Sequence, residues 1–281
     1  MSNKPTLIVA VSGGVDSMVM LDKLIKDGDY HLVVAHVNHG IRIDSDEDEV
    51  LVRSFAAKHG LSFESIKLNL GPGTSEQIAR RARHDFLSEV KQKYKAEVIA
   101  TAHHLDDVVE TIILNFLRGT GWRGLCSLRS TAVIQRPLID MRKSEVIAYA
   151  VDHRLAWRED STNDDLKYTR NLIRNLYLPR LNRQQFNRLV ELWRHQCRLR
   201  LDIDELVEPL FGADFDRRWL ELDDALVVEL LRAWLGRNYQ AATFARLITF
   251  ARTAQPGKKF NLPADEMILA KRDKLVDIGR R

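Results

Sequence analysis

Short apolar runs alternate with amphipathic stretches along the first half of the chain. The apolar runs are residues 7–11, 32–37, 63–68, 98–102 and 133–134, and helical spacing fills residues 17–26, 47–59, 75–94 and 105–117 between them. Strand–helix repeats of about 30 residues are typical of βαβ units. The runs are continuously apolar, as in strands covered on both faces. The pattern therefore predicts an α/β fold with a doubly wound, mainly parallel, Rossmann-like sheet.

The pattern turns helical after residue 142. Helices are expected at residues 143–153, 168–178, 184–201 and 225–237, and short strands at 259–262 and 267–269. Pro179 and the pair Asn182-Arg183 mark a boundary. A length of 281 residues suggests two domains. We therefore expect a catalytic domain over residues 1–183 and a smaller, mostly helical accessory domain over residues 184–281.

Composition narrows the class of protein. Hydrophobic residues make up 45% and charged residues 29%, which is ordinary for a globular chain. Without an apolar run of about 18 residues the sequence predicts no membrane association, and Cys126 and Cys197 are too few for a disulfide framework, so we expect a reducing, cytoplasmic setting. Residues 202–229 contain ten acidic residues and two arginines, a charge of −8, so the net charge of +4 leaves +12 on the rest. That distribution suggests a polyanionic partner, although solvated helix faces would also produce it.

A glycine-rich turn follows the first apolar run and leads into a helix. Residues 12–17 read SGGVDS. Paired glycines let a backbone approach an anion closely, and the helix start supplies free N–H groups and the positive end of its dipole. Ser12 and Ser17 add hydroxyl donors, while Asp16 suits a Mg²⁺ that bridges to phosphate. The loop predicts a phosphate site, and it is not a P-loop of the G-x-x-x-x-G-K-[ST] kind. The alternative is an ordinary strand–turn–helix with a capping serine.

This loop resembles the S-G-G-x-D-S signature of the PP-loop ATP pyrophosphatases, and further motifs resemble one family within them. In chain order, the motifs are AHVNHGIR (35–42), EQIARRAR (76–83), ATAHHLDDVVET (100–111), LRGTGWRG (117–124), RPL (136–138), WREDSTN (157–163) and RNLIR (170–174). Together they are similar to the catalytic domain of the tRNA(Ile)-lysidine synthetases over about residues 6–181. The last third resembles, more loosely, the compact form of that family.

The resemblance implies a reaction and its ligands. ATP would adenylate C2 of the wobble cytidine in the CAU-anticodon isoleucine tRNA, and free lysine would then displace AMP to give lysidine. The expected ligands are ATP, Mg²⁺ held by Asp16, lysine and that tRNA. The expected ATP-binding residues are Ser12, Gly13, Gly14, Val15, Asp16, Ser17 and Arg80, and the expected catalytic residues are Asp16, Arg83, Asp107 and Glu110.

Two carboxylates share one helical face near the end of the fourth apolar run. Asp107 and Glu110 are spaced i, i+3 at the sheet edge where α/β sites form. Two acids there suit cationic lysine, and one of them could take a proton from its amine. The alternatives are a metal site of His103, His104 and Asp106, or helix capping by Asp106 or Asp107. The sequence does not decide which carboxylate is the base.

Arginines form the expected RNA-binding set. Arg158, Arg170 and Arg174 could grip phosphates of the anticodon stem-loop or the target cytidine, although scattered surface arginines are the alternative. His36, His39 or Trp122 could stack on an unstacked base. The last third is expected to recognise the tRNA outside its anticodon. Its tryptophans, among them Trp193, fit core positions better than RNA contacts.

Other functions remain as weaker hypotheses. A PP-loop tRNA thiolation enzyme is the main alternative, but such enzymes commonly need paired cysteines, and Cys126 and Cys197 are isolated. A small-molecule amidotransferase would leave the later arginine motifs without a role. A non-catalytic tRNA-binding module is disfavoured by the intact phosphate loop. The sequence does not decide between a monomer and a homodimer.

Overall fold

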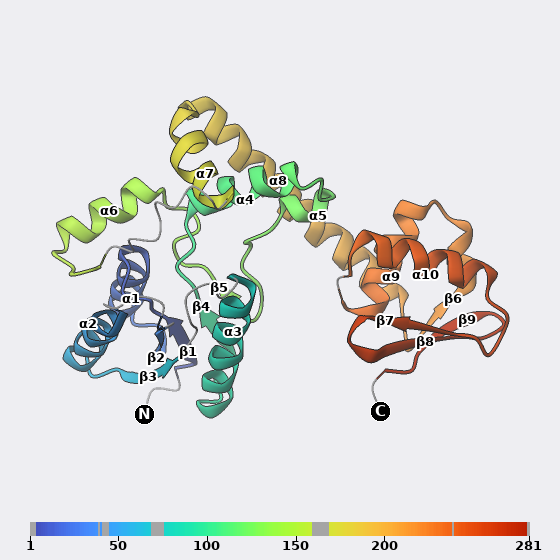
Figure 1. Ribbon diagram of the computed structural model, residues 1–281, viewed down its shortest axis with the longest axis horizontal. Helices are drawn as coiled ribbons and strands as arrows, with labels where there is room; N and C mark the ends of the chain where they lie inside the picture. The colour runs from blue at the N-terminus through green and yellow to red at the C-terminus, as the bar shows by residue number, and fades with distance from the viewer. Residues whose placement is uncertain are drawn as a thin grey trace. The chain divides into compact units, whose positions relative to one another are not determined.

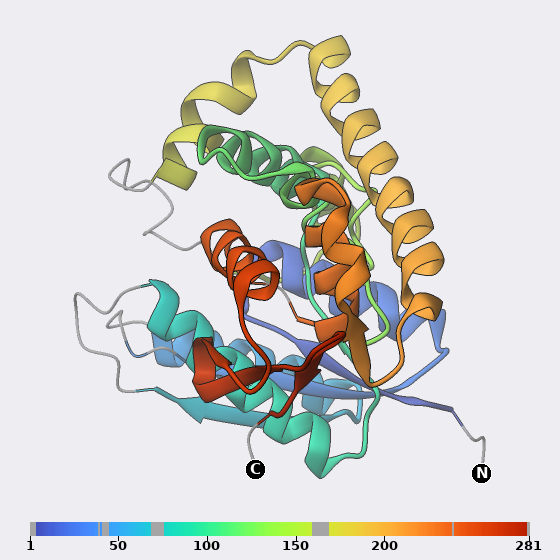
Figure 2. The ribbon, with the colours of Figure 1, turned by 90° about the vertical axis from the view of Figure 1, so that its right-hand side faces the viewer.

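The chain divides into two compact units, Met1–Gln196 and Cys197–Arg281. The computed structural model (Figure 1) describes residues 4–38, 40, 45–68, 76–158, 169–237 and 239–279. The dividing point lies inside the long helix α8 (Arg183–Val207), which is unbroken in Figure 2. Two units were expected, but with a boundary at residues 183/184, where the helix begins. A continuous helix carries the chain from one unit into the next, so the break in pattern near Pro179 marks the start of the connection instead.

Among the described residues of the first unit, five strands form a parallel sheet in the order β3-β2-β1-β4-β5. The strands are β1 (Thr6–Ala10), β2 (His31–Asn38), β3 (Ser62–Lys67), β4 (Val98–Ala100) and β5 (Ile134–Gln135). Val9 of β1 pairs with Val34 on one side and Ala100 on the other. The strand order therefore reverses direction at β1 and β4, and their carboxyl ends border the crevice where ligands bind in such sheets. The expectation of a parallel α/β sheet is confirmed.

Helices cover both faces of this sheet (Figure 1). They are α1 (Val15–Asp27), α2 (Ser45–Lys58) and α6 (Lys143–Asp152) on one face, and α3 (Glu76–Lys93) on the other. Alternate strand residues sort between the faces: Leu7 and Val9 pack with α1, α2 and α6, whereas Ile8 packs with Phe86 of α3. Burial on both faces is the physical reason why these strands read as continuous apolar runs.

Further helices extend the carboxyl edge of the sheet. They are α4 (Leu105–Leu117), α5 (Trp122–Leu125), α7 (Thr169–Leu172), the π-helical turn η2 (Ile173–Tyr177) and the 3₁₀ turn η3 (Leu178–Arg180). Leu105 and Val109 of α4 pack against Phe186 and Val190 of α8. Trp193 is buried, and its indole N–H donates to the Ser127 carbonyl at 2.8 Å, so it is a core residue as expected. This packing fixes the first turn of α4 at the edge of the sheet.

The second unit combines helices with an antiparallel sheet. Its elements after α8 are the 3₁₀ turn η4 (Glu208–Leu210), β6 (Asp214–Asp216), the 3₁₀ turn η5 (Arg217–Glu221), α9 (Asp224–Leu235), α10 (Ala241–Thr253), β7 (Lys259–Leu262), the 3₁₀ turn η6 (Pro263–Asp265), β8 (Glu266–Ala270) and β9 (Lys274–Asp277). The strand order is β6-β9-β8-β7, around a core that includes Phe215, Leu231 and Phe244. The two short strands expected at residues 259–262 and 267–269 are present as β7 and β8. The strands β6 and β9 and the helix α10 were not.

Within the described part of the chain, no helix is both long enough and apolar enough to span a bilayer.

Candidate active site

The turn between β1 and α1 is held in shape by one buried hydroxyl. Ser17 Oγ accepts hydrogen bonds from the backbone N–H groups of Ser12 at 3.1 Å and Gly13 at 3.2 Å, and donates to the Gly14 carbonyl at 2.9 Å. Gly13 has φ +95°, a backbone conformation that favours glycine. The Ser12 side chain is exposed, whereas Ser17 is buried. Ser17 therefore organises the predicted phosphate loop, and the Ser12 hydroxyl joins the same network, 3.2 Å from Ser17 Oγ and 3.4 Å from the Gly14 N–H.

Asp16 lies in the first turn of α1 and forms an ion pair that the sequence did not indicate. Lys143 Nζ lies 2.6 Å from one carboxylate oxygen of Asp16 and 2.8 Å from the other. Both side chains are about one-third exposed. His104 also lies near Asp16, with Nε2 3.8 Å from Asp16 and 3.5 Å from Asp107. The phosphate loop and the acidic face of α4 therefore approach the same imidazole nitrogen.

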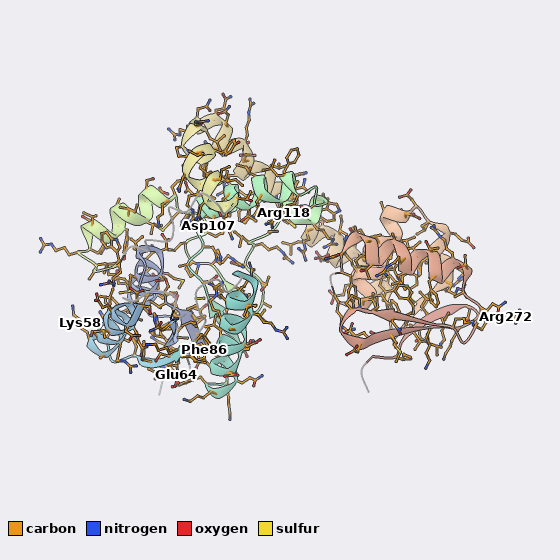
Figure 3. The ribbon with its side chains drawn as sticks, viewed as in Figure 1. Lys58, Glu64, Phe86, Asp107, Arg118 and Arg272 are labelled. Carbon is orange, nitrogen blue, oxygen red and sulfur yellow. The ribbon has the colours of Figure 1, made fainter. Side chains whose placement is uncertain are left out.

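Asp107 and Glu110 share the face of α4 that their spacing predicted, and Asp107 is marked in Figure 3. Both are buried, and both are already paired with arginines. Glu110 accepts from Arg174 Nε at 3.0 Å and from Arg170 Nε, and Asp107 accepts from an Arg174 terminal nitrogen at 3.2 Å. The sequence assigned these carboxylates to lysine and these arginines to RNA. The structure brings the two sets together in one cluster.

The electrostatic surroundings of the cluster shift two pKa values. Burial alone would raise the pKa of Asp107, but the ring and backbone N–H of His104, together with His103 and Arg174, hold it below its ordinary value. Asp107 also accepts from the His104 N–H at 3.0 Å, so it caps α4, as the alternative had proposed. Burial lowers the pKa of His103 to about 4. His103 is therefore a neutral ring beside a charged carboxylate at neutral pH.

The arginines predicted on α3 lie near the same edge. The pKa of His103 is lowered chiefly by burial, and the positive charges of Arg136, Arg83 and Arg170 add to that effect. Burial, with the charge of Arg80, lowers the pKa of Arg136. Arg80 and Arg83 are exposed at their own positions on α3. Three segments far apart in the sequence thus contribute positive charge around His103, where an anionic substrate would lie.

Asp106 has a structural role. Its carboxylate accepts from Arg142 Nε at 3.2 Å and from the backbone N–H of Lys143 at 2.8 Å, which fastens the start of α6 to the start of α4. Among the residues that the structure describes, no group of three histidines, cysteines or acidic residues could hold a metal ion. The alternative metal site of His103, His104 and Asp106 is therefore wrong. A single carboxylate that completes its shell with phosphate oxygens, as proposed for Asp16, does not need such a group.

Arg158 lies at the phosphate loop. Its backbone N–H donates to the Gly13 carbonyl at 3.0 Å, and its guanidinium pairs with Asp48 at 2.9 Å and with Glu47. These contacts brace the loop from α2. That Arg158 binds tRNA stays a prediction, and its contact with Gly13 places it next to the phosphate loop.

Two of the predicted stacking residues have other contacts. His36 is buried, and its Nδ1 lies 2.8 Å from the Val11 carbonyl, so it cannot stack on a base. The guanidinium of Arg123 lies over the Trp122 ring at 4.7 Å. His39 and the motif at residues 159–163 lie outside the described residues.

Known proteins resemble this chain in sequence and fold. A family model described as a PP-loop domain matches residues 2–181. The tRNA(Ile)-lysidine synthase of Solibacter usitatus is 39% identical over 212 residues, covering 74% of this chain and 47% of that protein. The synthase of Chlorobaculum tepidum is 37% identical over 189 residues, covering 63% of this chain and 57% of that protein. The chain spans about half the length of the curated relatives it matches.

A solved structure supports the fold assignment. The U34-tRNA thiolase NcsA from Methanococcus maripaludis, with its [4Fe-4S] cluster, matches with a TM-score of 0.59 at 20% identity, covering 70% of this chain and 73% of that chain. Identity this low is evidence for a common fold alone.

Proposed function

This chain belongs to the PP-loop domain family, whose members use ATP, and from that premise we propose that it is a tRNA(Ile)-lysidine synthetase. It would join free lysine to C2 of the wobble cytidine in the CAU-anticodon isoleucine tRNA. The similarity to curated lysidine synthases, over 74% and 63% of this chain, supports this reading.

One geometric observation carries the proposal: Asp16 and Asp107 approach the same atom, His104 Nε2, at 3.8 and 3.5 Å, so the phosphate loop and the acidic face of α4 meet at one nitrogen. A nucleotide on the phosphate loop and a cation on the acidic face of α4 would therefore be neighbours. The reaction needs this arrangement, because the adenylated cytidine must meet the amine of lysine in one pocket.

In the first step the C2 oxygen of cytidine attacks the α-phosphorus of ATP, and the bond to pyrophosphate breaks. The N–H groups in the first turn of α1, together with Arg80 and Arg83, would hold the phosphates and the departing pyrophosphate. Asp16, partly exposed at the mouth of the loop, would hold the Mg²⁺ that accompanies ATP. When bound, that ion would offset negative charge on the leaving group.

In the second step an amine of lysine attacks C2, the C2–O bond breaks, and AMP leaves. The amine must lose a proton to become nucleophilic, and the carboxylates of Asp107 and Glu110 are the acceptors that the geometry offers. Because Glu110 is fully buried and paired with Arg170 and Arg174, a lysine ammonium must displace one guanidinium to reach it. The displaced arginine would then be available for the cytidine or the phosphate of AMP, which reconciles its predicted role in RNA binding with its observed pairing to Glu110.

Transfer of labelled lysine to tRNA tests the proposal. The assay uses ATP and two transcripts that share the CAU anticodon, the isoleucine tRNA and the methionine tRNA. We expect label only on the isoleucine tRNA, resistant to mild alkali that would hydrolyse an aminoacyl ester, with one AMP and one pyrophosphate released for each lysine joined. Release of AMP without lysine incorporation would exclude lysidine formation while retaining PP-loop chemistry.

Matched carboxylate variants test the lysine site. Glu110→Gln should abolish lysine transfer while leaving ATP binding within about twofold of wild type, because the phosphate loop is unchanged. Glu64→Gln is the control. Glu64 is also ion-paired, with Lys93 at 2.7 Å, but it lies on β3 away from Asp107 (Figure 3). Equal activity of Glu110→Gln and Glu64→Gln would contradict the assignment.

Thiolation, the main alternative that the sequence left open, is the second candidate. The two cysteines belong to different units, and Cys126 is buried with its thiol donating to the Arg123 carbonyl at 3.1 Å. If the chain were a thiolase using these sulfurs, the Cys126→Ala, Cys197→Ala double variant would be inactive. We expect it to retain lysine transfer.

A further inference from the structure

The ion pair between Lys143 and Asp16 joins two helices at the mouth of the phosphate loop. Lys143 is the first residue of α6, and its ammonium reaches both carboxylate oxygens of Asp16, at 2.6 and 2.8 Å. Figure 1 shows α6 beside α1. Asp16 lies in the first turn of α1, where the loop presents its backbone N–H groups. The ammonium is therefore already at the place where phosphate oxygens would arrive.

The start of α6 is an unfavourable place for cations. Helix dipoles favour acidic side chains in the first turn, yet the N-cap of α6 is Arg142 and its first residue is Lys143. Asp106 compensates by accepting from the Arg142 guanidinium and from the Lys143 backbone N–H. This arrangement fixes the Lys143 backbone while its side chain extends toward Asp16. Departures from local preference that are compensated in this way are expected at functional sites.

The charges of Asp16 and ATP indicate a role for Lys143. A bare carboxylate in the phosphate loop would repel ATP, and Lys143 cancels that charge while no nucleotide is bound. The pair is not locked, because Lys143 is 38% exposed and lysine is a flexible point charge that binds phosphate readily. An ammonium on a flexible stem can move from a carboxylate to a neighbouring phosphate without a change in the backbone.

We propose that Lys143 is a phosphate ligand of ATP that changes partner. It pairs with Asp16 in the nucleotide-free protein, and it transfers to the β- and γ-phosphate oxygens when ATP binds. Asp16 is then left to the cation that accompanies the nucleotide. This inference rests on the ATP use of the family and is independent of lysine and tRNA as substrates.

Calorimetric titration of ATP into the full chain, with EDTA present and without tRNA or lysine, tests the lysine directly. Lys143→Met should weaken ATP binding about tenfold, the usual effect of losing a charge-assisted hydrogen bond. Lys26→Met is the matched control. Lys26 also links α1 to α6, through Asp22 at 2.8 Å and the Tyr149 hydroxyl at 3.1 Å, but at the far end of α1. Equal affinities for ATP in the two variants would overturn the proposal.

A second variant separates phosphate binding from a purely structural ion pair. Asp16→Asn leaves the ammonium without its carboxylate, so ATP in EDTA should bind several-fold more tightly than to wild type. The gain should disappear in the Asp16→Asn, Lys143→Met double variant. If the pair were only structural, Asp16→Asn would weaken ATP binding as much as Lys143→Met does. That outcome would overturn the proposal, even if Lys143→Met alone were poorly folded.

The Lys143 ammonium and Mg²⁺ would compete for the Asp16 carboxylate, so binding of Mg²⁺ alone is a further measurement. Lys143→Met should bind Mg²⁺ more tightly than wild type in the absence of nucleotide, because no ammonium occupies the carboxylate. Unchanged or weaker Mg²⁺ binding would contradict the exchange of partners. Since no measurement here involves lysine transfer, failure of the Lys143 assignment and failure of the proposed function are separate results.

Discussion

Acidification should destabilise the first unit through His103. Burial lowers the pKa of this ring to about 4, whereas a histidine in the unfolded chain has a pKa near 6.5. Between pH 4 and 6.5 the ring of His103 is mostly protonated in the unfolded chain and mostly neutral in the folded protein. The free energy of unfolding is therefore highest above pH 6.5 and falls as the pH drops from 6.5 toward 4.

The size of this effect follows from the two pKa values. At pH 5.0 the unfolded ring is about 97% protonated and the folded ring about 9%, which corresponds to a loss of about 2 kcal/mol relative to pH 7.5. The charge of Asp107 raises the pKa of His103, whereas the charges of Arg136, Arg83 and Arg170 lower it, so these contributions oppose one another. Burial is the larger influence, so the net direction is fixed by the fold.

Hydrogen exchange in urea, read on peptides from β1 and β2, measures unfolding of the first unit by itself. Other groups titrate over the same range, so the informative quantity is the difference between proteins. His103→Gln should lose about 2 kcal/mol less stability than wild type between pH 7.5 and 5.0. His195→Gln, on the exposed surface of α8, controls for the removal of a histidine. If His103→Gln lost as much stability as wild type, burial would not keep this ring neutral and the reasoning would be refuted.

Three further substitutions test other parts of the structure. Gly13→Ala should cost about 1–3 kcal/mol and weaken ATP binding, because φ is +95° and the new Cβ would lie 3.3 Å from that of Asp48; unchanged thermal unfolding with and without ATP would argue against a strained loop. Glu110→Gln should destabilise the first unit by about 2–3 kcal/mol, less than for a fully buried pair because both arginine partners are about one-third exposed; urea titration measures it. Phe244→Ala should cost about 3–5 kcal/mol in the second unit while ATP affinity stays within about twofold, and a large loss of ATP binding would disprove a nucleotide site built by the first unit alone.

The parallel sheet could be predicted because each of its strands and connecting helices carries its own hydrophobic pattern. Each strand is buried on both faces, so its sequence is apolar throughout, and each connecting helix repeats its apolar positions every three or four residues. The same signal was present in α10, where Phe244, Leu247, Ile248 and Ala251 follow helical spacing, and it was overlooked. The strand β6 gave almost no signal, because only Phe215 of its three residues is buried and the two neighbours are aspartates. Short strands depend on pairing with distant strands, here β9, for their existence.

In the candidate site, too, the relations within one helix could be predicted from the sequence, and the pairings between distant segments could not. Spacing along one helix correctly placed Asp107 and Glu110 on a common face, because that relation depends on α4 alone. Their pairing with Arg170 and Arg174, about sixty residues later, depends on how η2 and α7 fold back over α4, which no local pattern encodes. Lys143 was missed for the same reason, although a lysine at a helix start, against the dipole, was a visible signal.

The charges of the site are arranged so that each substrate would replace a protein group of its own sign. Lys143 is paired with the carboxylate of Asp16, and ATP would bring phosphate oxygens to take that carboxylate's place. Glu110 is paired with two guanidinium groups, and lysine would bring an ammonium to take the place of one of them. A buried charge left without a partner costs several kcal/mol, so a protein that must hold both sites before its substrates arrive needs internal partners. Under the proposed function, binding by exchange would also explain why the residues predicted for separate substrates contact one another here: the arginines and carboxylates would keep each other neutral until RNA and lysine separated them.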